Sequence, residues 1–221
     1  MGDLTIKTPK PLLEVDGRPF LDILIERAAS YGLRRFLLLT GYLGEAIADR
    51  YRTWGAERGL EIKCLFEPTP AGTAGALSFA AADLDDVFML ANGDTLFAVD
   101  LEALAGIPTS EGWLGKVALR RVADASRYGA VCLDGARVTS FCASVEAEPA
   151  LINGGVYVLR REILGWITQP PCFLETQVFP AIVATGQLFA QEFDSYFIDI
   201  GIPEDLARAR REIPVHLSRR E

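Results

Sequence analysis

Short apolar runs alternate with segments of helical periodicity between residues 19 and 95, and this alternation constrains the fold more than any other feature. The expected helices cover residues 19–31, 44–54 and 73–82, and the expected strands cover residues 35–40, 60–67 and 86–91. Strands and helices that alternate at this spacing favour a mostly parallel sheet with helices on both faces. We therefore predict an α/β fold.

The second half of the sequence has a different texture, because short strand patterns there follow one another through brief turns. Strands are expected at residues 116–121, 130–133, 138–141 and 152–159, and helices at residues 173–185, interrupted by Pro180, and 203–212. This pattern indicates a small mixed β extension of the sheet. We predict one domain over residues 1–221, with two halves at 1–111 and 112–221.

Composition argues against several classes of protein. The 22 Lys and Arg residues against 30 Asp and Glu residues give a net charge of -8, so we expect no general attraction to nucleic acid or to an anionic membrane. We find neither an apolar run of about 18 to 20 residues nor a signal-peptide pattern at the N-terminus. With His216 as the only histidine, zinc binding and Ser-His or Cys-His catalysis are poorly supported.

The four cysteines show no close paired spacing, and we expect them to be small core residues. They are Cys64, Cys132, Cys142 and Cys172. Scattered free thiols suit a reducing compartment, so the predicted location is the cytoplasm. The sequence gives no indication of the oligomeric state.

Asp94 follows the apolar run that ends at Ala91, after the dipeptide Asn92-Gly93. In open α/β sheets, ligands bind beyond the carboxyl ends of the strands, which makes Asp94 a candidate site residue. The alternative is a tight hairpin turn with an incidental acid, because Asn-Gly is also a strong hairpin signal.

Asp199 is the second candidate acid, because it lies among apolar residues in the run 197–203, where an unpaired carboxylate is costly. A cation is its natural partner. Mg²⁺ is typically held by one or two carboxylates and by substrate phosphate oxygens, so we predict that Asp94 and Asp199 share one Mg²⁺. The alternative is that Asp199 caps the helix that starts near Pro203.

Two further segments have phosphate-binding character. Lys10 stands between Pro9 and Pro11, and flanking prolines reduce the entropy lost when its ammonium is aimed at a phosphate; a solvated loop lysine is the alternative. Gly72-Thr73-Ala74 opens a helix with small residues, whose backbone N–H groups can face a ligand. Helix capping by Thr73 explains the same residues.

A third set of residues suits the hydroxyl groups of a sugar. Asn153 and Gly154 enter a strand, where the amide supplies both a donor and an acceptor and the glycine permits close backbone approach. Glu175 at a helix start can bind hydroxyls in the same way, and Tyr128-Gly129 adds an aromatic edge. Taken alone, each of these fits a turn or a cap better than a ligand contact.

Taken together and in this order, these segments resemble the sugar-1-phosphate nucleotidyltransferases, and most closely the branch that includes the heptose-1-phosphate guanylyltransferases. The resemblance covers nearly the whole chain. The matching runs are TPKPLL at 8–13, GRPFL at 17–21, TGYLGE at 40–45, GTAGAL at 72–77, NGDT at 92–95, RYG at 127–129, INGGVY at 152–157 and FIDIGIPED at 197–205.

The resemblance implies a Rossmann-like fold of the nucleotide-diphospho-sugar transferase type and a particular reaction. A sugar 1-phosphate attacks the α-phosphorus of a nucleoside triphosphate, with GTP favoured, and forms a nucleotide sugar and pyrophosphate. By analogy, Asp94 and Asp199 hold Mg²⁺, and Lys10 contacts phosphate. The implied nucleotide-binding residues are Glu67, Gly72, Thr73, Ala74, Asn92 and Gly93, and the implied sugar-binding residues are Tyr128, Gly129, Asn153, Gly154 and Glu175.

The sequence departs from the family pattern in two places. The family has a first strand and a glycine-rich loop ahead of the TPKP segment, where this sequence has only residues 1–7, and a Glu-Lys pair where this sequence has Cys142-Ala143-Ser144. We therefore expect little activity and an exposed sheet edge from residues 1–221 as they stand. The alternatives are a truncated inactive transferase, a non-catalytic nucleotide-sugar-binding or regulatory domain and, least favoured, a generic dinucleotide-binding domain, for which a G-x-G-x-x-G motif is lacking.

Overall fold

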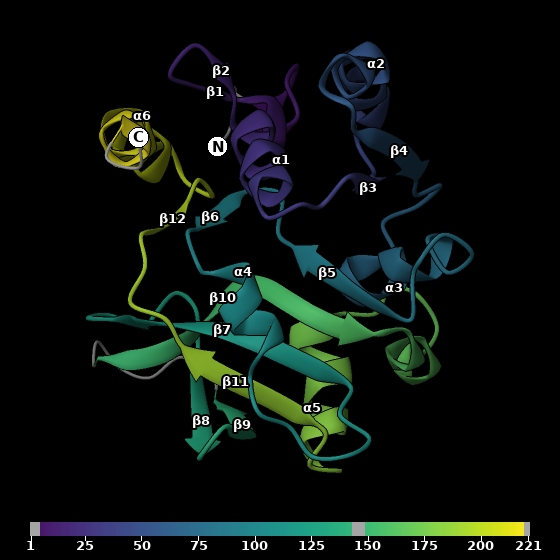
Figure 1. Cartoon of the computed structure of the whole chain (residues 1–221), viewed down its shortest axis with the longest axis vertical. Coiled ribbons are helices and arrows are strands. Elements are labelled where there is room, and N and C mark those ends of the chain that lie inside the picture. Colours follow the sequence, from purple (N-terminus) through teal and green to yellow (C-terminus); the bar gives the residue numbers. More distant parts are fainter. Residues whose placement is uncertain (1–4, 143–148, 219–221) are drawn as a thin grey trace. The chain divides into compact units, whose positions relative to one another are not determined.

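A computed structural model describes residues 5–142 and 149–218, so Ala143 and Ser144 lie outside the described residues. The chain divides into two compact units (Figure 1). Unit 1 comprises residues 1–68, 93–96 and 196–221, and unit 2 comprises residues 69–92 and 97–195. These units do not coincide with the halves expected at residues 111 and 112. The single domain over residues 1–221 stays a prediction.

Unit 1 consists of helices with three small pairs of strands. Its helices are α1 (Phe20–Ser30), α2 (Gly44–Trp54) and α6 (Pro203–Ser218), with short 3₁₀ turns at Lys10–Leu12 and Ala56–Arg58. Its strands are β1 (Glu14–Val15), β2 (Arg18–Pro19), β3 (Arg35–Thr40), β4 (Glu61–Phe66), β12 (Phe197–Asp199) and β6 (Thr95–Phe97), whose last residue belongs to unit 2. The pairs are β1–β2, β3–β4 and β12–β6.

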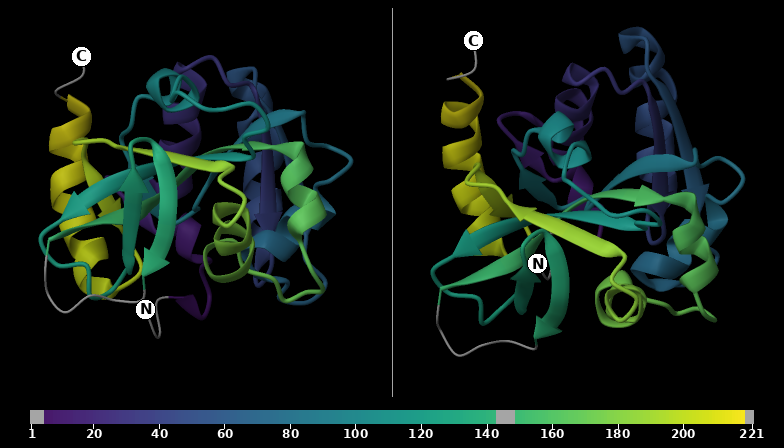
Figure 2. Two further views of the ribbon diagram at one scale, coloured as in Figure 1. Left: turned by 90° about the horizontal axis from the view of Figure 1, so that it is seen from below. Right: turned by 60° about the horizontal axis from the view of Figure 1, so that its bottom comes forward.

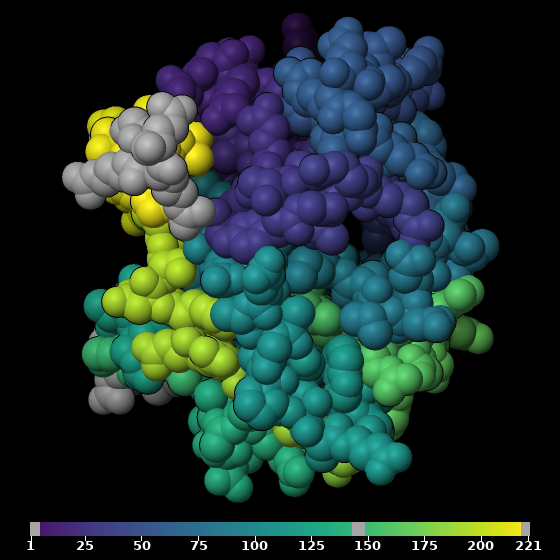
Figure 3. Space-filling view, viewed as in Figure 1, coloured from purple at the N-terminus to yellow at the C-terminus, as the bar shows by residue number. Residues whose placement is uncertain are grey.

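Helix α1 separates two apolar clusters of unit 1. Phe20 and Ile23 pack in a cluster with β12 and α6 that includes Ile198. Leu21 and Ile25 pack in the other cluster against α2, and the side chains of α1 and α2 lie against one another in Figure 3. Because apolar residues spaced three and four apart cover a wide stripe of a helix, α1 can be buried on both of these sides.

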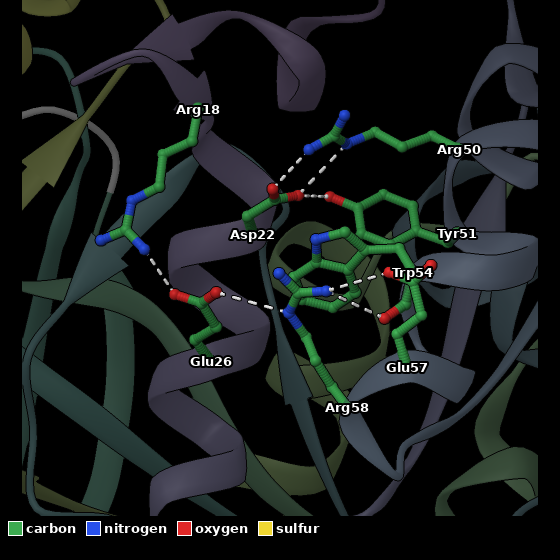
Figure 4. A network of polar contacts seen from close by, with 8 residues as sticks. All are labelled: Arg18, Asp22, Glu26, Arg50, Tyr51, Trp54, Glu57 and Arg58. Atoms are coloured by element: carbon green, nitrogen blue, oxygen red, sulfur yellow. Dashed lines mark hydrogen bonds and ion pairs between the residues drawn. The ribbon is translucent and has the colours of Figure 1, made fainter.

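A buried carboxylate also ties α1 to α2 (Figure 4). Asp22 of α1 accepts hydrogen bonds from the Arg50 guanidinium, at 2.5 Å to Oδ2, and from the Tyr51 hydroxyl, at 2.5 Å to Oδ1. Burial, followed by the contact with Asp22, raises the pKa of the Tyr51 phenol. The hydrogen bond to Asp22 likewise raises the pKa of Arg50. The carboxylate is therefore compensated by hydrogen bonds, as a buried charge requires.

Unit 2 contains a six-stranded mixed sheet with the order β5-β10-β7-β11-β9-β8 (Figure 1). The strands are β5 (Val87–Ala91), β7 (Gly115–Val122), β8 (Ala130–Asp134), β9 (Arg137–Cys142), β10 (Ala150–Arg160) and β11 (Leu188–Glu192). The helices are α3 (Gly72–Phe79), α4 (Leu101–Ala105) and α5 (Phe179–Val183), with a 3₁₀ helix at Arg161–Trp166 and a π-helical turn at Leu174–Val178.

The predicted α/β class is confirmed, but the parallel pairing is distributed differently from the expectation. The parallel pairs are β3–β4 in unit 1 and β7–β11 in unit 2. Strand β5 is an edge strand of the six-stranded sheet and pairs antiparallel with β10. An apolar run predicts burial but not the direction of its neighbour, and for this reason the sequence pattern missed this pairing.

Several short elements were not predicted, and one proline lies next to a change of helix type. The missed elements are β1, β2, β6, α4 and β11. Asp100 was a usable signal for α4, because its carboxylate accepts from the Glu102 and Ala103 amides as an N-cap. Pro180 lies in the first turn of α5, directly after the π-helical turn Leu174–Val178, so the helix expected at residues 173–185 changes type next to this proline.

Side-chain alternation along β10 determines which residues face which helix. Tyr157 lies opposite Val117, and its ring packs 5.3 Å from the ring of Phe179 in α5. The next residue pair is Val158 and Lys116, and the Lys116 ammonium donates to the Ala105 carbonyl of α4. Because successive side chains in a strand point to opposite faces, α4 and α5 cover opposite faces of the sheet.

The expectation that all four cysteines are core residues is wrong for two of them. Cys172 is buried and Cys64 is half-buried, but Cys132 and Cys142 are exposed. Both exposed cysteines lie on the hairpin β8–β9, where alternate side chains face away from the sheet's interior. In the described part of the chain, every helix falls short of the length and apolarity that crossing a bilayer requires.

Candidate active site

Asp94 lies in the turn that joins β5 to β6. Strand β5 pairs with β10, and β6 pairs with β12, so Asn92-Gly93 does not form a hairpin between β5 and β6. The hairpin in the alternative interpretation is therefore wrong, and the role of Asp94 stays a prediction. Asp94 follows the end of a strand in the way that ligand-binding residues of α/β proteins do.

Lys10 and Asp94 form an ion pair within unit 1. The Lys10 Nζ lies 2.9 Å from Asp94 Oδ2, and the two side chains remain 34% and 30% exposed. The 3₁₀ turn at Lys10–Leu12 positions the lysine, with the Leu12 amide donating to the Pro9 carbonyl. The interpretation of Lys10 as a solvated loop lysine is thus wrong, because its ammonium is aimed at the candidate acid.

Backbone pairing brings Asp199 beside Asp94 in the same unit. The amide of Ile200 donates to the Asp94 carbonyl oxygen at 2.9 Å. The Asp199 Oδ1 accepts from the Gly201 amide at 2.5 Å, in the turn that precedes α6. The Asp199 carboxylate therefore closes this turn.

The chemistry of these donors fits Mg²⁺, which prefers oxygen ligands. Among the described residues, no group of three or more His, Cys, Asp and Glu side chains could hold a metal ion. Two carboxylates alone give an incomplete coordination sphere, and Mg²⁺ commonly completes such a sphere with water and substrate phosphate oxygens. The donor set thus suits an ion that arrives with a phosphorylated ligand.

The N-terminus of α3 in unit 2 is occupied by protein contacts. The amides of Ala74 and Gly75 donate to the Cys172 carbonyl at 2.9 and 3.0 Å, so the Ala74 N–H does not face a ligand as we expected. Gly72 has a φ of +79°, and a Cβ there would collide with the Cys172 backbone. The glycine at this position is explained by this close approach of two chain segments.

Four polar residues of unit 2 form one hydrogen-bonded chain, which we name the sugar-side network: Asn153, Tyr157, Glu175 and Thr73. The Asn153 amide donates to the Tyr157 hydroxyl at 2.8 Å, and that hydroxyl donates to Glu175 Oε1 at 3.4 Å. The Thr73 hydroxyl lies 2.9 Å from Glu175 Oε2 and accepts from the Leu174 amide. Thr73 therefore does not cap its own helix, since the N-cap of α3 is Ala71.

Tyr157 is the member of this network that sequence reasoning missed. Its side chain is fully buried, and burial, with the nearby charge of Glu175, raises the pKa of its phenol. A signal was present, because Asn153 and Tyr157 are four positions apart in one strand and so share a face. A tyrosine hydroxyl in a buried strand also needs a polar partner.

The contacts of the remaining predicted residues do not distinguish a binding role from a structural one. Glu67 follows β4 and its amide donates to the Thr40 carbonyl, and the Asn92 amide donates to the Gly155 carbonyl. A Cβ on Gly93 would lie 3.5 Å from the Pro11 Cγ, and a Cβ on Gly154 would meet the ring of Phe97. Tyr128 and Gly129 lie in the turn before β8, where both amides donate to Ala125. Their roles in binding stay predictions.

A lysine paired with an acid, beside a second acid, carries groups that can bind a phosphorylated ligand together with a metal ion. Comparison with known families defines the class of protein. The model of the nucleotidyl transferase family matches residues 1–215. The chain belongs to the nucleotidyl transferase family, as its sequence resemblance implied.

Two individual relatives illustrate the similarity. The chain is 34% identical over 216 residues to the mannose-1-phosphate guanylyltransferase of Mycobacterium tuberculosis. The aligned region covers 95% of this chain and 60% of that protein. The crystal structure of HddC from Yersinia pseudotuberculosis complexed with GMP-PN has a TM-score of 0.81 and 28% identity, and covers 93% of this chain and 90% of that one. The chain thus spans less than two thirds of the length of the curated relative.

Proposed function

We propose that this protein transfers GMP from GTP to a sugar 1-phosphate, with a manno-configured hexose or heptose as the acceptor. The observation that carries the proposal is the ion pair between Lys10 and Asp94, with Asp199 brought beside it by the Ile200–Asp94 hydrogen bond. Support for the guanine nucleotide comes from the relatives, which include mannose-1-phosphate guanylyltransferases, and from a similar structure complexed with GMP-PN.

In the proposed reaction, an oxygen of the sugar phosphate forms a bond to the α-phosphorus of GTP. The bond from that phosphorus to the bridging oxygen breaks, and pyrophosphate leaves with the electron pair. A Mg²⁺ ion held by Asp94 and Asp199 supplies charge neutralisation for this in-line displacement.

Lys10 is proposed to contact phosphate oxygens by exchanging its carboxylate partner for the ligand. Both members of the ion pair are about one-third exposed, so neither needs to leave a buried environment to do so. Glu67, Asn92, Gly93 and the segment Gly72–Ala74 are proposed to lie at the nucleotide. Since the Ala74 N–H is bonded to Cys172, we propose that this segment contributes shape rather than an amide donor.

The sugar-side network is proposed to hold the acceptor sugar. Asn153 and Glu175 carry the amide and carboxylate groups that bind hydroxyls, and both are fixed by the buried Tyr157 hydroxyl. Tyr128, Gly129 and Gly154 complete the proposed set. The location that we propose is the cytoplasm, where four free cysteines are stable, with neither nucleic acid nor a membrane as a partner.

The test is a panel of nucleoside triphosphates and sugar 1-phosphates, with pyrophosphate release as the measurement. We expect the highest turnover with GTP and mannose 1-phosphate, and no turnover when EDTA removes Mg²⁺. A clear preference for thymidine or uridine triphosphate would overturn the assignment of the donor. Binding of GTP by calorimetry without any pyrophosphate release would instead identify a non-catalytic nucleotide-binding protein.

A further inference from the structure

Cys132 on β8 and Cys142 on β9 lie next to each other on the hairpin that these two strands form. The hairpin is visible in both views of Figure 2. The Sγ atoms of Cys132 and Cys142 are 3.7 Å apart. Both residues are exposed. A pair of adjacent thiols that is open to solvent can be oxidised without unfolding any of the chain.

The strand register explains why these thiols are neighbours. Cys132 lies opposite Ser140, and Cys142 lies opposite Ala130, so the two cysteines are diagonal neighbours across the antiparallel pair. They are on the same face, because side chains two positions apart in a strand point the same way. The Ser140 hydroxyl lies 3.6 Å from the Cys142 Sγ. The contact thus follows from the register of the hairpin.

The other two cysteines lack these properties. Cys172 is fully buried, and its Sγ accepts a hydrogen bond from the Thr168 hydroxyl at 3.6 Å. Cys64 is half-buried in β4, and burial raises the pKa of its thiol. Because thiol exchange requires access and the deprotonated sulfur, an oxidant will discriminate between the exposed pair and these two residues.

A metal site is a weaker explanation of the pair. Structural zinc sites use four protein ligands, and in the described ranges the structure contains no group of three or more candidate metal ligands. Two thiols alone do not complete such a site. Two thiols do suffice for a disulfide.

We propose that Cys132 and Cys142 form a reversible disulfide within the chain, by exchange with a small-molecule disulfide such as oxidised glutathione. The deprotonated sulfur of one cysteine attacks the small disulfide and releases one thiol, which leaves a mixed disulfide on the protein. The second cysteine then attacks that protein sulfur and releases the second small thiol. The protein loses two hydrogen atoms, and one glutathione disulfide is reduced to two thiols.

We expect the disulfide to affect the proposed sugar-binding residues of unit 2 through the backbone of Cys142. This part of the inference rests on the proposed function. A disulfide S–S bond is about 2.05 Å long, so oxidation must bring the two sulfur atoms closer together than their present 3.7 Å, and we expect Cys142 to shift as they approach. Gly129 has a φ of +75°, and a Cβ there would lie 2.9 Å from the Cys142 carbonyl oxygen. The backbone at Gly129 thus runs close to the Cys142 carbonyl, and a shift of Cys142 is expected to displace Gly129 and the adjacent Tyr128, both proposed sugar-binding residues.

The first experiment measures the covalent change and is independent of activity. The reduced protein is equilibrated with mixtures of reduced and oxidised glutathione, quenched with acid, alkylated and mapped by mass spectrometry. We expect a peptide that joins Cys132 to Cys142 within one chain, with both alkylation sites lost together. Cys132→Ser and Cys142→Ser should each abolish the linked peptide, and Cys64→Ser should retain it.

Two results of this first experiment would overturn the disulfide. One is stable glutathione attached separately to both cysteines without a linked peptide. The other is a bond that joins two different chains, which a non-reducing gel and the mass of the linked species would reveal. Both serine substitutions are at exposed positions, so loss of the linkage cannot be attributed to unfolding.

The second experiment measures the consequence for the sugar. Oxidation should raise the KM for the sugar 1-phosphate by about threefold or more, because small displacements of positioning groups weaken productive binding, and dithiothreitol should restore it. The KM for GTP should stay unchanged, and Cys132→Ser should remove the response. An unchanged sugar KM in the disulfide-bonded protein would overturn the coupling alone. Absence of both GTP binding and transferase activity in the reduced protein would refute the proposed function, and the peptide map would still decide the disulfide.

Discussion

Lys10 and Asp94 in unit 1 form a single ion pair whose side chains remain 34% and 30% exposed, whereas the sugar-side network of unit 2 is built around Tyr157, which is 0% exposed. An exposed ion pair contributes little to stability, because water screens the charges and two long side chains must be held in place. A buried hydroxyl that is satisfied on both sides costs far more to disturb.

The comparison indicates that the two sets of residues differ in how easily their contacts can be broken. The ion pair can be broken at low free-energy cost. This suits the proposed reaction, in which Lys10 leaves Asp94 to contact phosphate oxygens and Asp94 leaves Lys10 to bind a metal ion. The sugar-side network is fixed before any ligand arrives, which suits a site that must select among hydroxyl configurations. If this distinction is correct, substitutions in the Lys10–Asp94 ion pair affect activity alone. Substitutions in the sugar-side network affect activity and stability together.

The largest expected effect is that of Asp94→Asn. This change removes the charge that pairs with Lys10 and that we propose to hold Mg²⁺, and we expect kcat/KM to fall by about 10²- to 10³-fold, as when one preorganised electrostatic group is lost. Asp49→Asn is the matched control, since Asp49 is an exposed partner of Arg52 in the same unit. Pyrophosphate release measures both. An Asp94→Asn protein with activity within about twofold of the unsubstituted protein would place the metal elsewhere.

Asn153→Ala tests the other side of the comparison. It removes the donor to the Tyr157 hydroxyl and the acceptor for the Gly155 amide. We expect the KM for the sugar 1-phosphate to rise about tenfold, the value of one hydrogen bond of about 1.4 kcal/mol, and the KM for GTP to change less than about twofold. Thr139→Ala, at an exposed position of β9, serves as the control. Equal changes in the two KM values would show that Asn153 does not discriminate the sugar.

The fold was predictable to the extent that it depends on local pattern. The helices α1 and α2 and the strands β3, β4 and β5 follow from periodicity, because one apolar face or run suffices to define each of them. The position of β5 beside β10 did not follow, since it depends on a partner about 65 positions away in the sequence, which no local pattern specifies.

The candidate site was predictable in its residues more than in its contacts. Asp199 could be selected because an unpaired carboxylate among apolar residues is costly. Asp94 could be selected because it follows the end of a strand, and Lys10 because its flanking prolines restrict the backbone. Tyr157 was missed because a tyrosine in an apolar strand resembles a core residue until its hydroxyl is seen between Asn153 and Glu175. The pairing of Cys132 and Cys142 required the register of β8 and β9.

Tyr157→Phe sharpens the comparison through stability. The change leaves the ring in place against Phe179 and removes only the hydroxyl, so Asn153 and Glu175 each lose one partner. We expect the free energy of unfolding to fall by about 1–2 kcal/mol, measured by urea denaturation. Tyr42→Phe is the matched control, because the Tyr42 hydroxyl donates to the Ile6 carbonyl from a largely exposed side chain. Equal losses in the two variants would mean that the sugar-side network is no more rigid than the surface.

The smallest expected effect is that of Lys10→Met on stability. Since both side chains of the ion pair are about one-third exposed, we expect the free energy of unfolding to change by less than about 0.5 kcal/mol. The change should vanish in high salt, where the screening length falls from about 10 Å at 0.1 M to about 3 Å at 1 M. Urea denaturation at the two salt concentrations measures both effects. A loss of more than about 2 kcal/mol that persists in high salt would mean that the pair is held as rigidly as Tyr157. The phosphate side would then be as preorganised as the sugar side, and the exchange of Lys10 from carboxylate to phosphate would no longer be an inexpensive step.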